Sequence, residues 1–93
     1  MKTAHPKSYM TDAERAELRA GGMSENGMYL AESQAANAAN DAEASWAWLA
    51  KAELPAYTLM SLKKWNGAQF IRDMGFPTAN ADAAYGPGWL DQA

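Results

Sequence analysis

The sequence predicts an all-α fold: a small helical bundle with one long Ala-rich helix, a short helical hairpin and an irregular C-terminal tail. Three observations support this prediction. Alanine, which has the highest helix propensity, recurs through residues 24–53 without a proline. Residues that favour helix starts stand at Thr11 and Pro55. Asn66-Gly67 provides a turn between two short helical segments.

The amino-terminal residues 1–10 are expected to form a flexible arm, because Pro6 interrupts them and no periodicity is visible. A chain of this size holds one core, so residues 11–93 are predicted as a single helical domain. Tyr9 and Met10 could fold back on it. The first helix begins with a capping box at Thr11–Glu14 and ends at Gly21-Gly22. Leu18 is its only large apolar residue, so this helix is expected at the periphery.

The segment 24–53 is the dominant feature, and a continuous or gently kinked helix of about 26 residues and about 39 Å is favoured. Its small residues invite close approach of a neighbouring helix, from this chain or from a second copy in a homodimer. Alternatively, Asn37, Asn40 and Asp41 break the run into two helices. Steps of three and four residues place one stripe along the segment: Met28, Ala31, Ala35, Ala38, Ala42, Trp46 and Leu49.

A third helix is predicted from Pro55 to about Trp65, with Leu59 and Leu62 on one face. A fourth short helix over 68–74 ends at Gly75. Thr78 then caps a weak helical turn through Ala84, and residues 85–90 form an irregular Gly-Pro-Gly tail.

Composition argues against several functions. The chain has no cysteine and one histidine, His5, so zinc ligands are lacking and no cofactor or metal is expected. Carboxylate pairs such as Asp41 and Glu43 stand two residues apart on presumed helices and do not converge. No histidine is held for nucleophilic catalysis, so the protein is not expected to be an enzyme. Neither a signal peptide nor an apolar stretch of about 20 residues is present, which favours the cytoplasm and no membrane contact.

Residues 55–76 resemble a helix-turn-helix in outline, since two short helices join at a tight turn. This alternative makes the protein a small DNA-binding regulator. Its nucleic-acid contacts are Lys63, Lys64, Gln69 and Arg72. Few polar residues of the second helix could read bases, and the acidic chain, with a net charge of −3, is a poor candidate for tight nonspecific binding.

Residues 21–54 carry five carboxylates against one lysine, Lys51, which gives −4. On a continuous helix, Glu25, Glu32 and Glu43 fall on nearly one face, where a basic groove of a partner could engage them. Trp46 and Trp48 point in nearly opposite directions on a helix, so one of them faces away from the shared stripe. Trp48, and Trp89 in the tail, are therefore either core residues or exposed interface anchors.

The leading hypothesis is a noncatalytic inhibitor or adaptor that occupies the surface of a larger protein or ribonucleoprotein that handles nucleic acid. Small inhibitors made by phages and mobile elements, including anti-CRISPR proteins, are similar in size and style, with no shared motif. The expected partner contacts are Glu25, Glu32, Glu43, Trp48 and Trp89.

Overall fold

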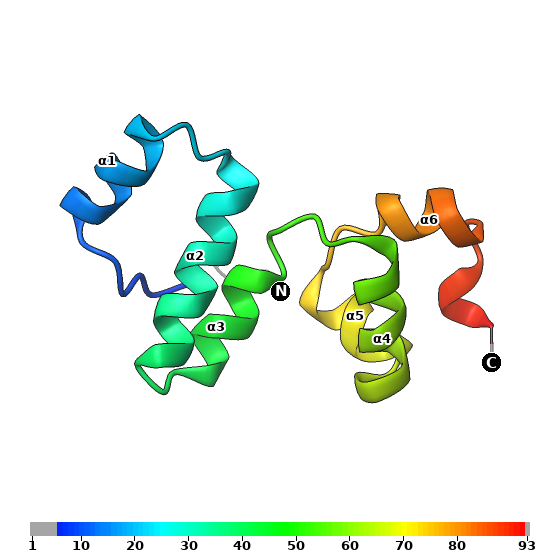
Figure 1. The fold of residues 1–93 in the computed structure, drawn as a ribbon. Helices are drawn as coiled ribbons and strands as arrows, with labels where there is room; N and C mark the ends of the chain where they lie inside the picture. Colours follow the sequence, from blue (N-terminus) through cyan, green and yellow to red (C-terminus); the bar gives the residue numbers. More distant parts are fainter. Residues whose placement is uncertain (1–5, 93) are drawn as a thin grey trace. The chain divides into compact units, whose positions relative to one another are not determined.

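The computed structural model describes residues 6–92, and within that range all regular structure is helical (Figure 1). The all-α prediction is confirmed. The chain forms two compact units, residues 1–52 (unit 1) and residues 53–93 (unit 2). His5 lies outside the described residues. In residues 6–92, every helix falls short of the length and hydropathy that a bilayer-spanning helix needs.

Unit 1 begins with a peripheral helix, α1 (Asp12–Ala20). The predicted capping box is confirmed: the Thr11 hydroxyl accepts from the Glu14 amide at 3.1 Å, and the Glu14 carboxylate accepts from the Thr11 amide at 2.8 Å. The chain leaves the helix through Gly21 and Gly22, the latter at a φ of 90°. As expected of a peripheral helix, α1 buries none of its residues.

The favoured continuous helix over 24–53 is wrong, because the segment forms two helices, α2 (Glu25–Ala38) and α3 (Ala42–Leu49). Asn40 adopts a φ of 63°, a left-handed conformation that asparagine tolerates better than most residues. The Asp41 carboxylate then accepts from the Ala44 amide at 3.0 Å and caps α3. Local side-chain chemistry at the turn thus overrides the helix propensity of the flanking alanines.

Helices α2 and α3 pack side by side as a hairpin (Figure 1). Ala36, Ala44 and Trp48 form the buried cluster between them, and Tyr9 and Tyr29 pack against it. The small side chains allow the close approach that the alanine content predicts, and the neighbouring helix comes from the same chain.

The buried face of α2 differs from the predicted stripe. It consists of Met28, Glu32, Ser33 and Ala36, whereas Ala38 of the predicted stripe is exposed. The Ser33 hydroxyl donates to the Ser45 carbonyl of α3 at 2.8 Å, which satisfies a polar group inside this contact. The buried face of α2 therefore includes two polar residues, Glu32 and Ser33, which a pattern of apolar residues alone does not predict.

Residues 6–10, the described part of the predicted arm, contact α2 and α3. The Trp48 indole nitrogen donates to the Lys7 carbonyl at 2.9 Å, across 41 positions of sequence. The Ser8 hydroxyl donates to the Glu32 carboxylate at 2.7 Å. Tyr9 is half-buried against the cluster, as the sequence suggested.

Unit 2 contains α4 (Ala56–Asn66), α5 (Ala68–Met74), α6 (Ala79–Tyr85) and a final 3-10 turn, η1 (Trp89–Asp91). Helix α4 packs against both α5 and α6. The predicted irregular tail contains this 3-10 turn, which places Trp89 in the interior at 0% exposure. The other large buried side chains of this unit are Leu54, Leu59, Leu62, Ile71 and Phe76.

The α4–α5 corner is a single residue, Gly67, with φ 92° and ψ 156°. This conformation is essentially restricted to glycine. The predicted end of α5 at Gly75 is confirmed, and Gly75 takes the left-handed cap conformation at a φ of 78°.

Candidate functional site

The predicted acidic row does not form. Glu25 is exposed at the start of α2, where its carboxylate accepts from the Tyr29 hydroxyl at 2.9 Å. Glu32 is only 4% exposed. Glu43 is exposed on α3, beyond the turn that ends α2. Because the row required one continuous helix with three solvent-facing carboxylates, its assignment as a joint partner contact is corrected.

The burial of Glu32 has a specific cause. One carboxylate oxygen accepts from the Ser8 hydroxyl at 2.7 Å, and the other lies 3.6 Å from Nη1 of Arg15. Arg15 also donates to the Ser8 hydroxyl and to the Met10 carbonyl. A buried charge is tolerated when it is paired and hydrogen-bonded. Glu32 therefore joins the amino-terminal segment, α1 and α2.

Both predicted tryptophan contacts are buried. Trp48 is 7% exposed and stacks on Tyr29 with ring centroids 6.2 Å apart. Trp89 is fully buried, and its indole nitrogen donates to the Asp82 carboxylate at 2.9 Å. Neither ring is available as the exposed anchor that the sequence hypothesis required. Both tryptophans are core residues, which is one of the two alternatives that the sequence left open.

The residues of the DNA-binding alternative have partners within unit 2. Lys63 donates to the carbonyls of Trp89 and Gln92 at 2.5 and 2.6 Å. Gln69 donates to the Asp73 carboxylate at 2.8 Å, and Arg72 pairs with Asp91. Lys64 is exposed at the end of α4. Three of the four predicted contacts thus stabilise the unit itself.

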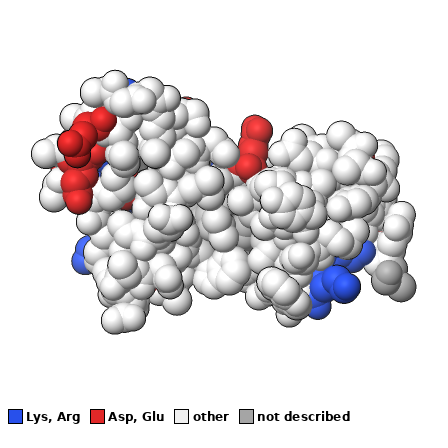
Figure 2. Space-filling model, viewed as in Figure 1, with Lys and Arg blue, Asp and Glu red and all other residues white. Residues whose placement is uncertain are grey.

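The α4–α5 corner also differs from a helix-turn-helix, whose turn has about three or four residues. In Figure 2, the visible face of unit 2 is mostly uncharged and shows a patch of basic side chains at one end. Duplex binding depends on several phosphate neutralisations, so this face offers little for it.

The sequence analysis missed an exposed face of α4. Trp65 is 80% exposed and Tyr57 is 71% exposed, whereas Leu59 and Leu62 of the same helix are buried. At about 100° per residue, Tyr57, Ser61 and Lys64 lie roughly opposite the two leucines, and Trp65 lies next to Ser61, about 90° from the leucines. We call this set the α4 outer face: Tyr57, Ser61, Lys64 and Trp65.

The leucine spacing could have revealed part of the α4 outer face. Once Leu59 and Leu62 are assigned to the core, helical geometry points Tyr57 and Lys64 away from it. Trp65 stands three residues after Leu62, at the edge of the leucine face, so its exposure does not follow from the spacing. The sequence argument instead treated the rings as scarce core material, because the chain has four tryptophans and only two phenylalanines. Because this chain has few large apolar side chains to fill its core, an exposed tryptophan calls for an explanation other than packing.

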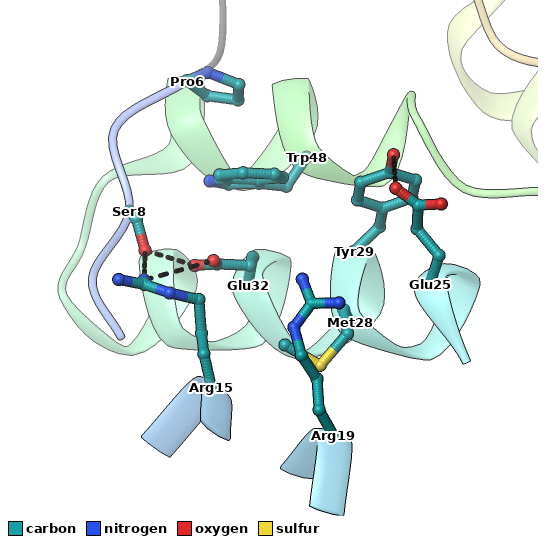
Figure 3. A pocket seen from close by; sticks show the side chains of 9 residues that line it. All are labelled: Pro6, Ser8, Arg15, Arg19, Glu25, Met28, Tyr29, Glu32 and Trp48. Carbon is teal, nitrogen blue, oxygen red and sulfur yellow. Dashed lines mark hydrogen bonds and ion pairs between the residues drawn. The ribbon is translucent and has the colours of Figure 1, made fainter. Parts of the chain in front are cut away.

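Unit 1 holds an open cavity of about 390 Å³ beneath α1 (Figure 3). Trp48, Tyr29 and Met28 supply its aromatic and apolar wall, and Arg15 and Arg19 enter it from α1. The nine lining residues are Pro6, Ser8, Arg15, Arg19, Glu25, Met28, Tyr29, Glu32 and Trp48. Three of the predicted contacts, Glu25, Glu32 and Trp48, are therefore brought together here, although as cavity walls.

The shifted pKa values in unit 1 come from tyrosine–carboxylate hydrogen bonds. The bond to Glu25 raises the pKa of Tyr29, burial adds to this, and the nearby charge of Arg19 opposes it. The bond from Tyr9 lowers the pKa of Asp41, and the Ala44 amide lowers it further. In residues 6–92, no group of three His, Cys, Asp or Glu side chains is placed to hold a metal ion.

No protein-family model matches the chain, and neither a curated protein nor a solved structure matches it.

Proposed function

We propose that this is a noncatalytic binding protein that engages a larger protein through the α4 outer face. The observation that carries the proposal is the 80% exposure of Trp65. Tryptophan and tyrosine dominate the energetics of protein interfaces, because each buries a large area with few rotatable bonds. Tyr57 lies on the same face and extends the aromatic surface along the helix.

The chemistry of the α4 outer face defines the kind of partner. Lys64 stands next to Trp65, so the matching surface has an apolar pocket with a carboxylate at its rim. This differs from the basic groove expected from the acidic row, since Glu32 is buried. Inhibition of a nucleic-acid-handling protein remains our finer hypothesis. It rests on the small size of the chain and its lack of catalytic motifs.

The test is a quantitative affinity capture from a bacterial lysate, with and without nuclease treatment. The bait is the tagged full chain, compared with the double variant Tyr57→Ala/Trp65→Ala. Tyr85→Ala is the matched control, because Tyr85 is an exposed aromatic on α6 of the same unit. We expect a stoichiometric protein that survives nuclease, is lost with the double variant and is retained with the control.

Three outcomes would overturn the proposal. Equal recovery of the protein by the double variant would show that the α4 outer face is not the binding surface. Recovery that depends on intact nucleic acid would favour the DNA-binding regulator, for which Lys64 and Arg72 are the exposed cations of the predicted set. Capture of untagged copies of the chain alone would indicate a homo-oligomer.

A further inference from the structure

The cavity of unit 1 has a structural origin. Helix α1 buries no residue, so it does not fill the space over α2 with apolar side chains. It is instead anchored through Arg15, which donates to the Ser8 hydroxyl and the Met10 carbonyl and pairs with Glu32. The remaining space of about 390 Å³ is within the size range of small-molecule sites.

The aromatic wall of the cavity is fixed in place. The Trp48 indole nitrogen is hydrogen-bonded to the Lys7 carbonyl, and the Tyr29 hydroxyl to the Glu25 carboxylate. The two rings stack with an interplanar angle of 28°. Since the polar atoms of both rings have protein partners, their contribution to the cavity is aromatic surface, against which a planar group packs favourably.

The charged side chains that line the cavity differ in whether they already have a hydrogen-bond or ion-pair partner. Glu25 and Glu32 both accept hydrogen bonds from hydroxyl groups, and Glu32 is also paired with Arg15. The side chain of Arg19, in contrast, makes no hydrogen bond or ion pair with the described part of the chain, and its charge acts on Tyr29 only through space. Figure 3 shows its side chain extending from α1 toward the cavity. A guanidinium binds carboxylate or phosphate groups through two parallel hydrogen bonds.

We propose that this cavity binds a small planar aromatic anion, with its ring against Trp48 and Tyr29 and its carboxylate or phosphate on Arg19. The site lies in unit 1 and does not involve the α4 outer face, so it stands independently of the proposed function. Arg15 keeps the entrance open by holding α1, and Arg19 provides the charge that selects an anion.

The test is a titration of the full chain, labelled with ¹⁵N, followed by the indole N–H resonance of Trp48. Indole-3-acetate probes an aromatic carboxylate, and adenosine monophosphate probes an aromatic phosphate. The neutral controls are indole-3-acetamide and adenosine, and the ring-free controls are acetate and inorganic phosphate. We expect saturable shifts of the Trp48 resonance with at least one aromatic anion at millimolar concentration. The anion that binds shows whether the site takes a carboxylate or a phosphate.

Variants test the role of Arg19. We expect Arg19→Gln to weaken binding about tenfold, as loss of a charge-assisted hydrogen bond does. Lys51→Gln removes a cation of the same unit outside the cavity and is expected to leave binding unchanged. The dispersion of the amide spectrum verifies that each variant is folded. The Arg19 side chain makes no hydrogen bond or ion pair with the described residues, so we expect its replacement to preserve the fold.

Three results would overturn the proposal. An unchanged Trp48 resonance with both aromatic anions removes the site. Equal affinity for the neutral analogues removes the requirement for an anion and the role of Arg19. Equal shifts with acetate or inorganic phosphate remove the requirement for a ring.

Discussion

Tyr9 and Asp41 are joined by a 2.7 Å hydrogen bond that spans 32 positions of sequence. The hydroxyl of Tyr9 donates to Oδ2 of Asp41, while Oδ1 of the same carboxylate accepts from the Ala44 amide and caps α3. One carboxylate therefore fastens the amino-terminal segment to the start of a helix. The bond raises the pKa of Tyr9 and lowers the pKa of Asp41, in each case as the largest cause.

Tyr9→Phe tests this bond at acid pH. A carboxyl whose pKa is lowered by folding contributes stability above its ordinary pKa of 3.8, and this contribution is lost as the pH falls through the lowered value. We expect Tyr9→Phe to move the pKa of Asp41 upward, measured by NMR titration of its carboxyl carbon. Tyr57→Phe removes an exposed hydroxyl and should leave that titration unchanged. An identical Asp41 pKa in wild type and Tyr9→Phe would contradict the assignment.

The same bond has an alkaline consequence. A tyrosine whose pKa is raised by folding contributes stability below its ordinary value of 10.0, and this is lost as the pH rises through the raised value. We expect the thermal midpoint of the wild type to fall above about pH 10. The fall should be smaller in Tyr9→Phe, with the remainder due to Tyr29, whose pKa is also raised. An equal fall of the thermal midpoint with rising pH in both proteins would contradict this role of Tyr9.

A matched pair of tryptophan substitutions tests the assignment of core and surface. Trp89 is fully buried, so Trp89→Ala should lower the free energy of unfolding by about 3–5 kcal/mol. Trp65→Ala removes an 80% exposed ring and should change it by less than about 0.5 kcal/mol. Urea denaturation followed by circular dichroism measures both. A large loss for Trp65→Ala would mean that its ring supports the fold and does not form a free surface.

A matched pair of glycine substitutions tests the α4–α5 corner. Gly67→Ala places a Cβ on a residue at φ 92° and ψ 156°, and we expect a loss of about 1–3 kcal/mol. Gly88 has a φ of −95° and open space at its Cβ position, so Gly88→Ala should be neutral or slightly stabilising. Equal effects of the two changes in urea denaturation would argue against the Gly67 geometry.

A third pair separates the two glutamates that sequence reasoning treated alike. Glu32→Lys places a cation beside Arg15 in a buried site and should destabilise unit 1 by about 3–5 kcal/mol. Glu43→Lys changes an exposed side chain and should shift stability by less than about 0.5 kcal/mol. Thermal unfolding compares them. Comparable midpoints would place Glu32 at the surface, contrary to its 4% exposure.

Much of the fold could be predicted where a residue acts on its immediate neighbours. The capping box at Thr11, the turn at Asn66-Gly67 and the left-handed cap at Gly75 all depend on contacts within a few positions. The break between α2 and α3 is also local. Alanine propensity, which is averaged over many residues, favours one continuous helix there, whereas the turn needs only Asn40 and Asp41.

The candidate sites required information that local patterns do not contain. Glu32 is buried because Ser8 and Arg15 reach it from two other segments, and no periodicity specifies those partners. The wall of the cavity likewise joins Trp48 to Lys7, far apart in the chain. The exposure of Tyr57, in contrast, follows from the leucine spacing of α4, whereas that of Trp65, near the end of the helix, does not.

The exposed ring of Trp65 also makes the protein its own optical reporter. Indole emission shifts to longer wavelength in water, and a dissolved quencher such as iodide reaches only rings at the surface. Trp48 and Trp89 are shielded by the fold and Trp46 is half-buried, so the most quenchable part of the red-edge emission comes from Trp65. A partner that covers α4 would shift that emission to the blue and protect it from iodide, which allows engagement to be followed without a label.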